Sequence, residues 1–234
     1  MRKLIVLMQT TLDGRISNAD GLFWQPFAWG EEETAYVNEA FARADTWAGS
    51  RKLYEFVVPY WEQVAAGTSP DSDVQDSPAS LEFARLLGAM RKVVLSRTLA
   101  DDPSTRREVR SGDAVEHLRK LKEQEGDEII ASFGPRTLGP LADSPGLIDE
   151  YLLVIHPAVL ASGPRLFDHL TRDLALTLTS ARVFDSGAAV MRYRALEATA
   201  EPSAPPSASD TPRRPDEQRQ HSRRVPRTPP RGNF

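Results

Sequence analysis

The sequence predicts a three-layer α/β/α fold with a mixed, mostly parallel sheet. Short apolar runs typical of buried strands alternate with segments whose apolar residues recur at helical spacing. Strands separated by helices form parallel βαβ units, so most of the sheet should be parallel. Two strand-like segments flank Asp185, Ser186 and Gly187, a pattern typical of a hairpin, which would add antiparallel strands at the C-terminal edge.

The first half of the folded part is predicted to hold three strands and three helices. Residues 3–8 form an apolar strand, and residues 31–43 have helical spacing with acidic residues at the start, where they favour the helix dipole. An acidic, Ser/Pro-rich surface loop is predicted over residues 68–78. The other elements are a strand over 46–48, a helix over 51–57, a helix over 81–90 capped by Ser80, and a strand over 92–95.

The second half follows the same alternation. A helix over 114–124 begins at Ser111 or Asp113 and ends at Gly126, because these residue types favour helix starts and stops. The elements that follow are a strand over 128–133, a helix over 137–142, and strands over 149–155, 175–184 and 189–196.

We expect one folded domain over residues 1–197 and a disordered Pro/Arg-rich tail over residues 198–234. The tail has few apolar residues and cannot offset the entropy cost of ordering. Seven arginines against four acidic residues give it a charge of +3, so the net charge of −4 leaves −7 on an acidic body. An acidic body gives no reason to expect nucleic-acid binding by the folded domain. The tail arginines could contact RNA or an anionic surface, although a solvated tail is the simpler interpretation.

Composition excludes several kinds of site. The chain has no cysteine, which rules out a disulfide framework, a thiolate metal site and a cysteine nucleophile. Its four histidines are scattered without the pairing of a zinc site, so we expect no metal. The first apolar run is too short for a signal peptide or a membrane span. We therefore expect a cytoplasmic protein without a membrane partner, acting on a small-molecule substrate.

Small, hydroxylated or cationic residues follow four of the predicted strands. In open α/β sheets, ligands bind in crevices beyond the carboxyl ends of the strands. The candidate residues are Thr11, Asp13 and Gly14 after the first strand, Gly49, Ser50, Arg51 and Lys52 after the second, Ser96 and Arg97 after the third, and Gly134, Pro135, Arg136, Thr137 and Leu138 after the strand over 128–133.

These four groups together indicate a dinucleotide site. Two of them open helices, whose free amide donors favour a pyrophosphate. The hydroxyl and guanidinium of Ser96 and Arg97 suit the 2′-phosphate that distinguishes NADPH from NADH. Each group alone also fits an ordinary turn, cap or surface arginine. Asp13 is the candidate catalytic residue, as a group that orients substrate or relays a proton.

No hydrolase or phosphate-loop motif is present, which suits hydride transfer, where the cofactor carries the chemistry. His156 is better explained as a structural histidine than as a base. Trp24, Trp29 and Trp61 suit stacking on a flat ring or covering the edge of the core.

A family pattern with matching order and spacing is present in four parts of the chain. These are residues 1–6 leading into 11–14, residues 44–61, residues 92–99 and residues 146–167. Through them the chain resembles the dihydrofolate-reductase-like reductases related to the C-terminal domain of the bacterial bifunctional riboflavin-biosynthesis protein. The resemblance implies an NADPH-dependent oxidoreductase, often a homodimer, acting on a pyrimidine- or pteridine-like ring. The implied activity is that of a 5-amino-6-(5-phosphoribosylamino)uracil reductase or a dihydrofolate reductase.

The chain departs from that family pattern at two places in the expected pyrophosphate site. Leu53 stands where the family has a hydroxyl, and Pro135 with Arg136 replaces a glycine-rich turn. Two alternatives therefore stay open. One is a degenerate member that binds a ligand without turnover, and the other is a reductase that uses a flavin or deazaflavin carrier.

Overall fold

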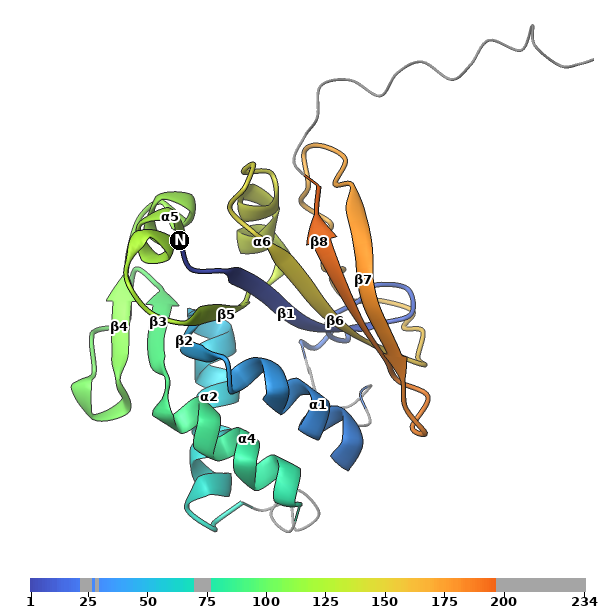
Figure 1. Cartoon of the computed structure of the whole chain (residues 1–234), viewed down its shortest axis with the longest axis horizontal. Helices are drawn as coiled ribbons and strands as arrows, with labels where there is room; N and C mark the ends of the chain where they lie inside the picture. The colour runs from blue at the N-terminus through green and yellow to red at the C-terminus, as the bar shows by residue number, and fades with distance from the viewer. Residues whose placement is uncertain (22–26, 28–29, 70–76, 197–234) are drawn as a thin grey trace, which may run out of the picture. The chain divides into compact units, whose positions relative to one another are not determined.

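A mixed eight-stranded sheet forms the centre of the domain, and the computed structural model describes residues 1–21, 27, 30–69 and 77–196. The strand order is β4-β3-β2-β5-β1-β6-β8-β7 (Figure 1). The strands are β1 (Leu4–Thr11), β2 (Ala44–Ser50), β3 (Arg91–Leu95), β4 (Arg107–Arg110), β5 (Glu128–Ser132), β6 (Glu150–His156), β7 (Leu176–Val183) and β8 (Ala189–Ala195). Strands β1 to β6 are mutually parallel, while β8 runs antiparallel to β6 and β7.

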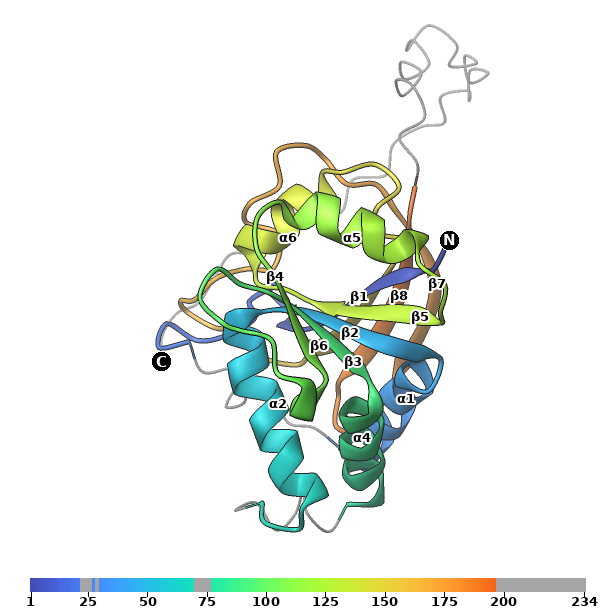
Figure 2. The same ribbon diagram turned by 90° about the vertical axis from the view of Figure 1, so that its left-hand side faces the viewer.

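Helices cover both faces of this sheet, as Figure 2 shows. Helices α1 (Glu31–Phe41), α2 (Arg51–Ala65) and α4 (Pro78–Ala89) pack together on one face, and α5 (Ala114–Glu123) packs beside α6 (Pro135–Ala142) on the other. The central strands β1 and β5 are buried on both sides, with Leu4, Ile5 and Ile130 fully shielded from solvent. The predicted three-layer fold is therefore confirmed.

The hairpin predicted around residues 185–187 is also confirmed. It joins β7 to β8, with the Phe184 N–H donating to the Ala188 carbonyl at 2.9 Å. Gly187 has a φ of +83°, which a side chain would make unfavourable. The predicted tail lies outside the described residues from 197 on, as does most of the acidic loop predicted over 68–78.

Two local predictions differ from the structure. The helix predicted to end at residue 57 continues as α2 through Pro59 to Ala65, because its buried apolar side chains hold it against the sheet. Ser77 rather than Ser80 caps α4, its hydroxyl accepting from the Ser80 N–H at 3.1 Å, since Pro78 already occupies the first helical position.

Two further elements were not predicted, the 3₁₀ turn η1 (Pro103–Thr105) and strand β4. Strand β4 has the sequence Arg-Glu-Val-Arg, without the apolar run that marks a buried strand. It lies at the edge of the sheet and pairs only with β3, where charged side chains can face solvent. No helix among the described residues is long and apolar enough to cross a membrane.

At the amino ends of the central strands, a buried arginine joins the start of β1 to the starts of β2 and β5. Arg2 is 6% exposed, and its guanidinium forms an ion pair with Asp45. It also donates to the Asp127 carbonyl at 2.6 Å and to the Thr46 hydroxyl at 2.9 Å. Asp45 thus neutralises a cation that would otherwise be costly to bury.

Candidate active site

At the carboxyl ends of β2 and β5, the chain leaves two neighbouring strands toward opposite faces of the sheet. The two strands are parallel neighbours, with Gly49 opposite Ser132. Helix α2 leaves β2 toward one face, whereas α6 leaves β5 toward the other (Figure 2). Ligands in open α/β sheets bind in the crevice that such a divergence opens. The pairing of Ser50 with Leu95 puts the end of β3 beside it as well.

The two helices that start at this crevice have uncapped N-termini. Ser50 and Gly134 are the N-cap residues of α2 and α6, and neither helix has a capping side-chain hydrogen bond or an acidic residue in its first turn. By contrast, Ser77 and Asp113 cap α4 and α5 through their side chains. The starts of α2 and α6 therefore keep free amide donors and an uncompensated positive end.

Four predicted cations surround these helix starts and are exposed. Arg51 makes an ion pair with Glu55 at 3.5 Å, on a surface where such pairs are weak. Lys52, Arg97 and Arg136 form no ion pair with any described residue. The crevice thus combines amide donors with cations, which is the chemistry that an anion requires.

The two glycines predicted at the crevice differ in surroundings. A Cβ added to Gly134 would meet no atom within 4 Å, so the space beside this backbone is open. A Cβ on Gly49 would come within 2.1 Å of the Trp47 ring. Gly49 therefore makes room for an aromatic side chain of the core, whereas Gly134 leaves an open approach to the start of α6.

The remaining predicted residues at these strand ends have local roles as well. The Ser96 hydroxyl accepts from the Thr98 and Leu99 N–H groups, both at 3.1 Å, and so fixes the turn that carries Arg97. Pro135 opens α6, and the Thr137 N–H donates to the Gly134 carbonyl. Leu138 is fully buried, so only its backbone is near the crevice.

The loop after β1 is a tight turn built around Asp13. One carboxylate oxygen accepts from the Thr11 hydroxyl at 2.6 Å and from the Leu160 N–H at 3.3 Å, and the other accepts from Arg15 at 2.9 Å. The Thr11 hydrogen bond is the main reason that the pKa of Asp13 lies below its usual value. Gly14 has a φ of +79°. Asp13 is thus an ionised carboxylate whose three partners hold the turn, and its catalytic role stays a prediction.

The same turn is braced against the loop that follows β6. Arg15 donates to the Leu160 carbonyl at 2.9 Å and to the Gly163 carbonyl. The Ile16 N–H donates to the Pro164 carbonyl at 3.0 Å, and the Leu166 N–H donates to the Gly14 carbonyl at 2.9 Å. Two loops that are distant in sequence therefore form one hydrogen-bonded unit beside the end of β1.

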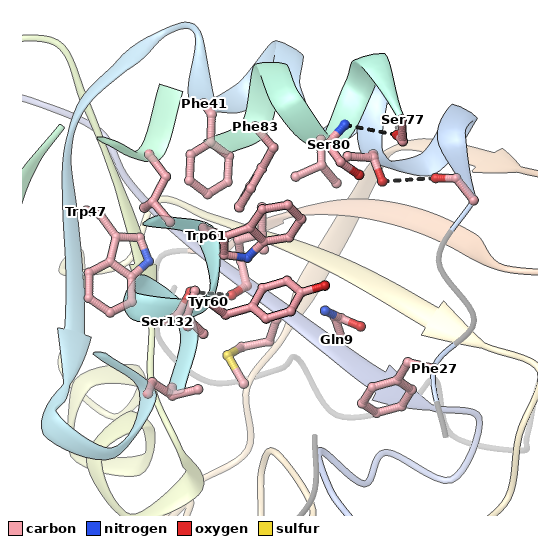
Figure 3. A pocket seen from close by; sticks show the side chains of 18 of the residues that line it. Gln9, Phe27, Phe41, Trp47, Tyr60, Trp61, Ser77, Ser80, Phe83 and Ser132 are labelled. Atoms are coloured by element: carbon pink, nitrogen blue, oxygen red, sulfur yellow. Dashed lines mark hydrogen bonds between the residues drawn. The ribbon is translucent and has the colours of Figure 1, made fainter. Parts of the chain in front are cut away.

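A cavity of about 670 Å³ lies between the sheet and helices α1, α2 and α4. Figure 3 shows the rings of Phe41, Phe83 and Trp61 gathered along one wall, with Gln9 and Phe27 on the opposite side. The Trp61 and Phe83 ring centres are 4.6 Å apart. The aromatic residues that line the cavity are Phe27, Phe41, Trp47, Tyr60, Trp61 and Phe83.

A few polar groups interrupt this aromatic lining, as is usual for small-molecule sites. Ser132, at the end of β5, lines the cavity two residues before Gly134, so cavity and crevice meet there. Its hydroxyl donates to the Leu7 carbonyl at 3.0 Å. The polar residues of the lining are Gln9, Glu31, Thr34, Ser77, Ser80 and Ser132.

Sequence reasoning found little of this cavity. Trp61, for which stacking on a flat ring and covering the edge of the core were both open, lines the cavity, whereas Trp24 and Trp29 lie outside the described residues. Leu53, the departure from the family hydroxyl, is 6% exposed and also lines the cavity. His156 is buried and stacks on Phe27 with ring centres 4.6 Å apart, which fits the structural interpretation.

Comparison with known proteins agrees with this architecture. The RibD C-terminal domain model matches residues 2–190. The uncharacterized protein YyaP of Bacillus subtilis is 27% identical over 194 residues, covering 82% of this chain and 94% of that one. A diaminohydroxyphosphoribosylaminopyrimidine deaminase/5-amino-6-(5-phosphoribosylamino)uracil reductase from Thermotoga maritima has a TM-score of 0.58 and 13% identity, covering 83% of this chain and 57% of that one.

The fold is also shared with a dihydrofolate reductase from Enterococcus faecalis that was solved in complex with NADP(H). That structure has a TM-score of 0.52 and 13% identity, and the match covers 82% of this chain and 96% of that one. At such identities the structural matches establish the fold, while the domain model spans most of the chain. The chain is therefore a member of the RibD C-terminal domain family.

Proposed function

We propose that this protein is an NADPH-dependent reductase that transfers a hydride to a flat heterocyclic substrate held in the aromatic cavity. The observation that carries the proposal is the pair of uncapped helix starts, α2 and α6, at neighbouring strand ends. Amide donors, a positive helix end and exposed cations are what a pyrophosphate needs. The cavity opens beside them at Ser132, where a nicotinamide ring and a substrate ring could meet.

The residues present fit the cofactor, because Gly134 leaves open space where a Cβ would block close approach. In this proposal Ser50, Arg51 and Lys52 hold one side of the pyrophosphate, and the backbone at Gly134 and Arg136 with the Arg136 guanidinium holds the other, while Pro135, Thr137 and Leu138 form the helix start that presents them. Ser96 and Arg97 take the 2′-phosphate. Thr11 and Gly14 lie toward the nicotinamide side.

The protein's own contribution is to orient the two rings and exclude water. When bound, NADPH supplies the hydride. The aromatic walls of α1, α2 and α4 keep the reacting rings out of bulk solvent, while Gln9 and Thr34 offer hydrogen-bonding groups that can fix the orientation of a ring.

Titration with NADPH tests the proposal directly. Because Trp47 and Trp61 line the cavity, cofactor binding is expected to quench tryptophan fluorescence, with a Kd between about 1 and 100 μM. Absence of binding at about 1 mM NADPH would contradict the proposal.

A single substitution tests the placement of the 2′-phosphate. Arg97→Ala is expected to weaken NADPH binding about tenfold, because an exposed guanidinium that pairs with the phosphate is lost. The matched control is NADH, whose affinity should not change because it lacks that phosphate. An equal loss of affinity for NADPH and NADH would show that Arg97 does not contact the 2′-phosphate.

A further inference from the structure

The charge distribution divides the site into an anion-binding crevice, which has cations, and a cavity whose described lining has a carboxylate, Glu31, and no cation. Two of the helix starts at the cavity carry carboxylates, and the first of them, α1, has Glu31, Glu32 and Glu33 in its first turn. The second, α4, is met by the Glu31 carboxylate, which accepts from the Ala79 N–H at 2.8 Å and from the Ser77 hydroxyl. Both positive helix ends are therefore already matched by carboxylates.

No cation compensates for this inside the cavity. Among the described residues that line it there is no lysine, arginine or histidine. A phosphate placed here would lose its hydration without gaining a partner, which is strongly unfavourable.

From this contrast we infer that the substrate of the proposed reductase is an uncharged, flat, aromatic heterocycle without a phosphate group. The inference rests on the proposed function and goes beyond it by assigning the class of substrate. It also sets this chain apart from the Thermotoga maritima relative, whose name specifies a phosphoribosylamino-uracil. The six aromatic side chains of the cavity offer stacking surfaces to such a ring.

Riboflavin and FMN form a matched pair of probes, because they share one ring system and differ by a single phosphate. The full chain is titrated with each at low ionic strength, and binding is followed by flavin fluorescence. Riboflavin is expected to bind at least tenfold more tightly than FMN, because only FMN must desolvate a phosphate. Equal affinities, tighter binding of FMN, or no binding of riboflavin at about 1 mM would each overturn the inference.

Two variants at one position locate the effect in the cavity. Gln9 is half-buried on β1 and lines the cavity, so Gln9→Lys places a cation among the aromatic walls. This variant is expected to bind FMN at least as tightly as riboflavin, reversing the preference. The matched control Gln9→Met, of similar length and without charge, should keep the preference for riboflavin. An unchanged preference in Gln9→Lys would show that the flavins bind elsewhere and would overturn the inference.

Trp61→Ala gives an independent check, since it removes one stacking wall. It should weaken riboflavin binding about tenfold, measured by flavin fluorescence. An unchanged riboflavin affinity would overturn the cavity assignment. The NADPH titration separates the two proposals, because a chain that binds NADPH but fails the flavin tests keeps its proposed function and loses only this substrate class.

Discussion

At the scale of single residues, a substitution at Gly134 gives the most direct test of the proposed cofactor site. Its φ of −69° and ψ of 166° suit any residue, and the space beside it is empty. Gly134→Ala should therefore fold normally but place a methyl group where the pyrophosphate approaches. We expect NADPH affinity to fall about tenfold, measured by the same fluorescence titration.

Gly88→Ala is the control for that substitution. Gly88 lies in α4 with no atom within 4 Å of an added Cβ, and it does not line the cavity. The change should leave NADPH binding intact and raise stability by about 0.5 kcal/mol, because alanine is the better helix former. A Gly134→Ala variant that binds NADPH as tightly as this control would contradict the pyrophosphate site.

At the scale of elements, the buried strands could be predicted from the sequence, whereas the edge strand β4 and the cavity could not. Strands β1 and β5 are buried on both faces, and their apolar runs predicted them. Strand β4 lies at the sheet edge with three charged residues in four, so no run marked it. The cavity was missed for a related reason. Phe41 and Phe83 have the spacing of core residues, and only the packing of three helices shows that space remains between them.

The attachment of β1 to β2 and β5 predicts a dependence of stability on pH. Burial of Asp45 favours its neutral form, but hydrogen bonds from the Thr46 hydroxyl and the Asp127 N–H and the charge of Arg2 outweigh it, and the pKa of Asp45 is lowered. A carboxyl whose pKa is lower in the folded state stabilises the fold above its unfolded pKa, here 3.8. That contribution is lost as the pH falls through the folded-state pKa.

Asp45→Asn tests this dependence by urea unfolding. The wild-type protein should be more stable than the variant at about pH 7, and the difference should shrink as the pH falls below 3.8, the value for the unfolded carboxyl. A difference that stays constant over this range would show that the Asp45 charge contributes nothing to folding.

At the scale of the whole molecule, the body and the tail are expected to be independent. The folded unit ends near residue 198, and the tail that follows is predicted from its composition to be disordered. A chain ending at Leu196 should therefore keep its Tm within about 2 °C and its NADPH affinity unchanged. A loss of more than about 5 °C in differential scanning fluorimetry would indicate that the tail packs on the domain.

The cross-braced loops after β1 and β6 have a consequence for hydrogen exchange. The amides of Ile16 and Leu166 each donate to a carbonyl of the other loop, so neither can open while the other stays closed. Both amides should take up deuterium at one common rate, slower than that of an ordinary surface turn. Asp13→Asn, which weakens the bond to Arg15, should speed both rates together, and acceleration in one segment alone would show that the loops move separately.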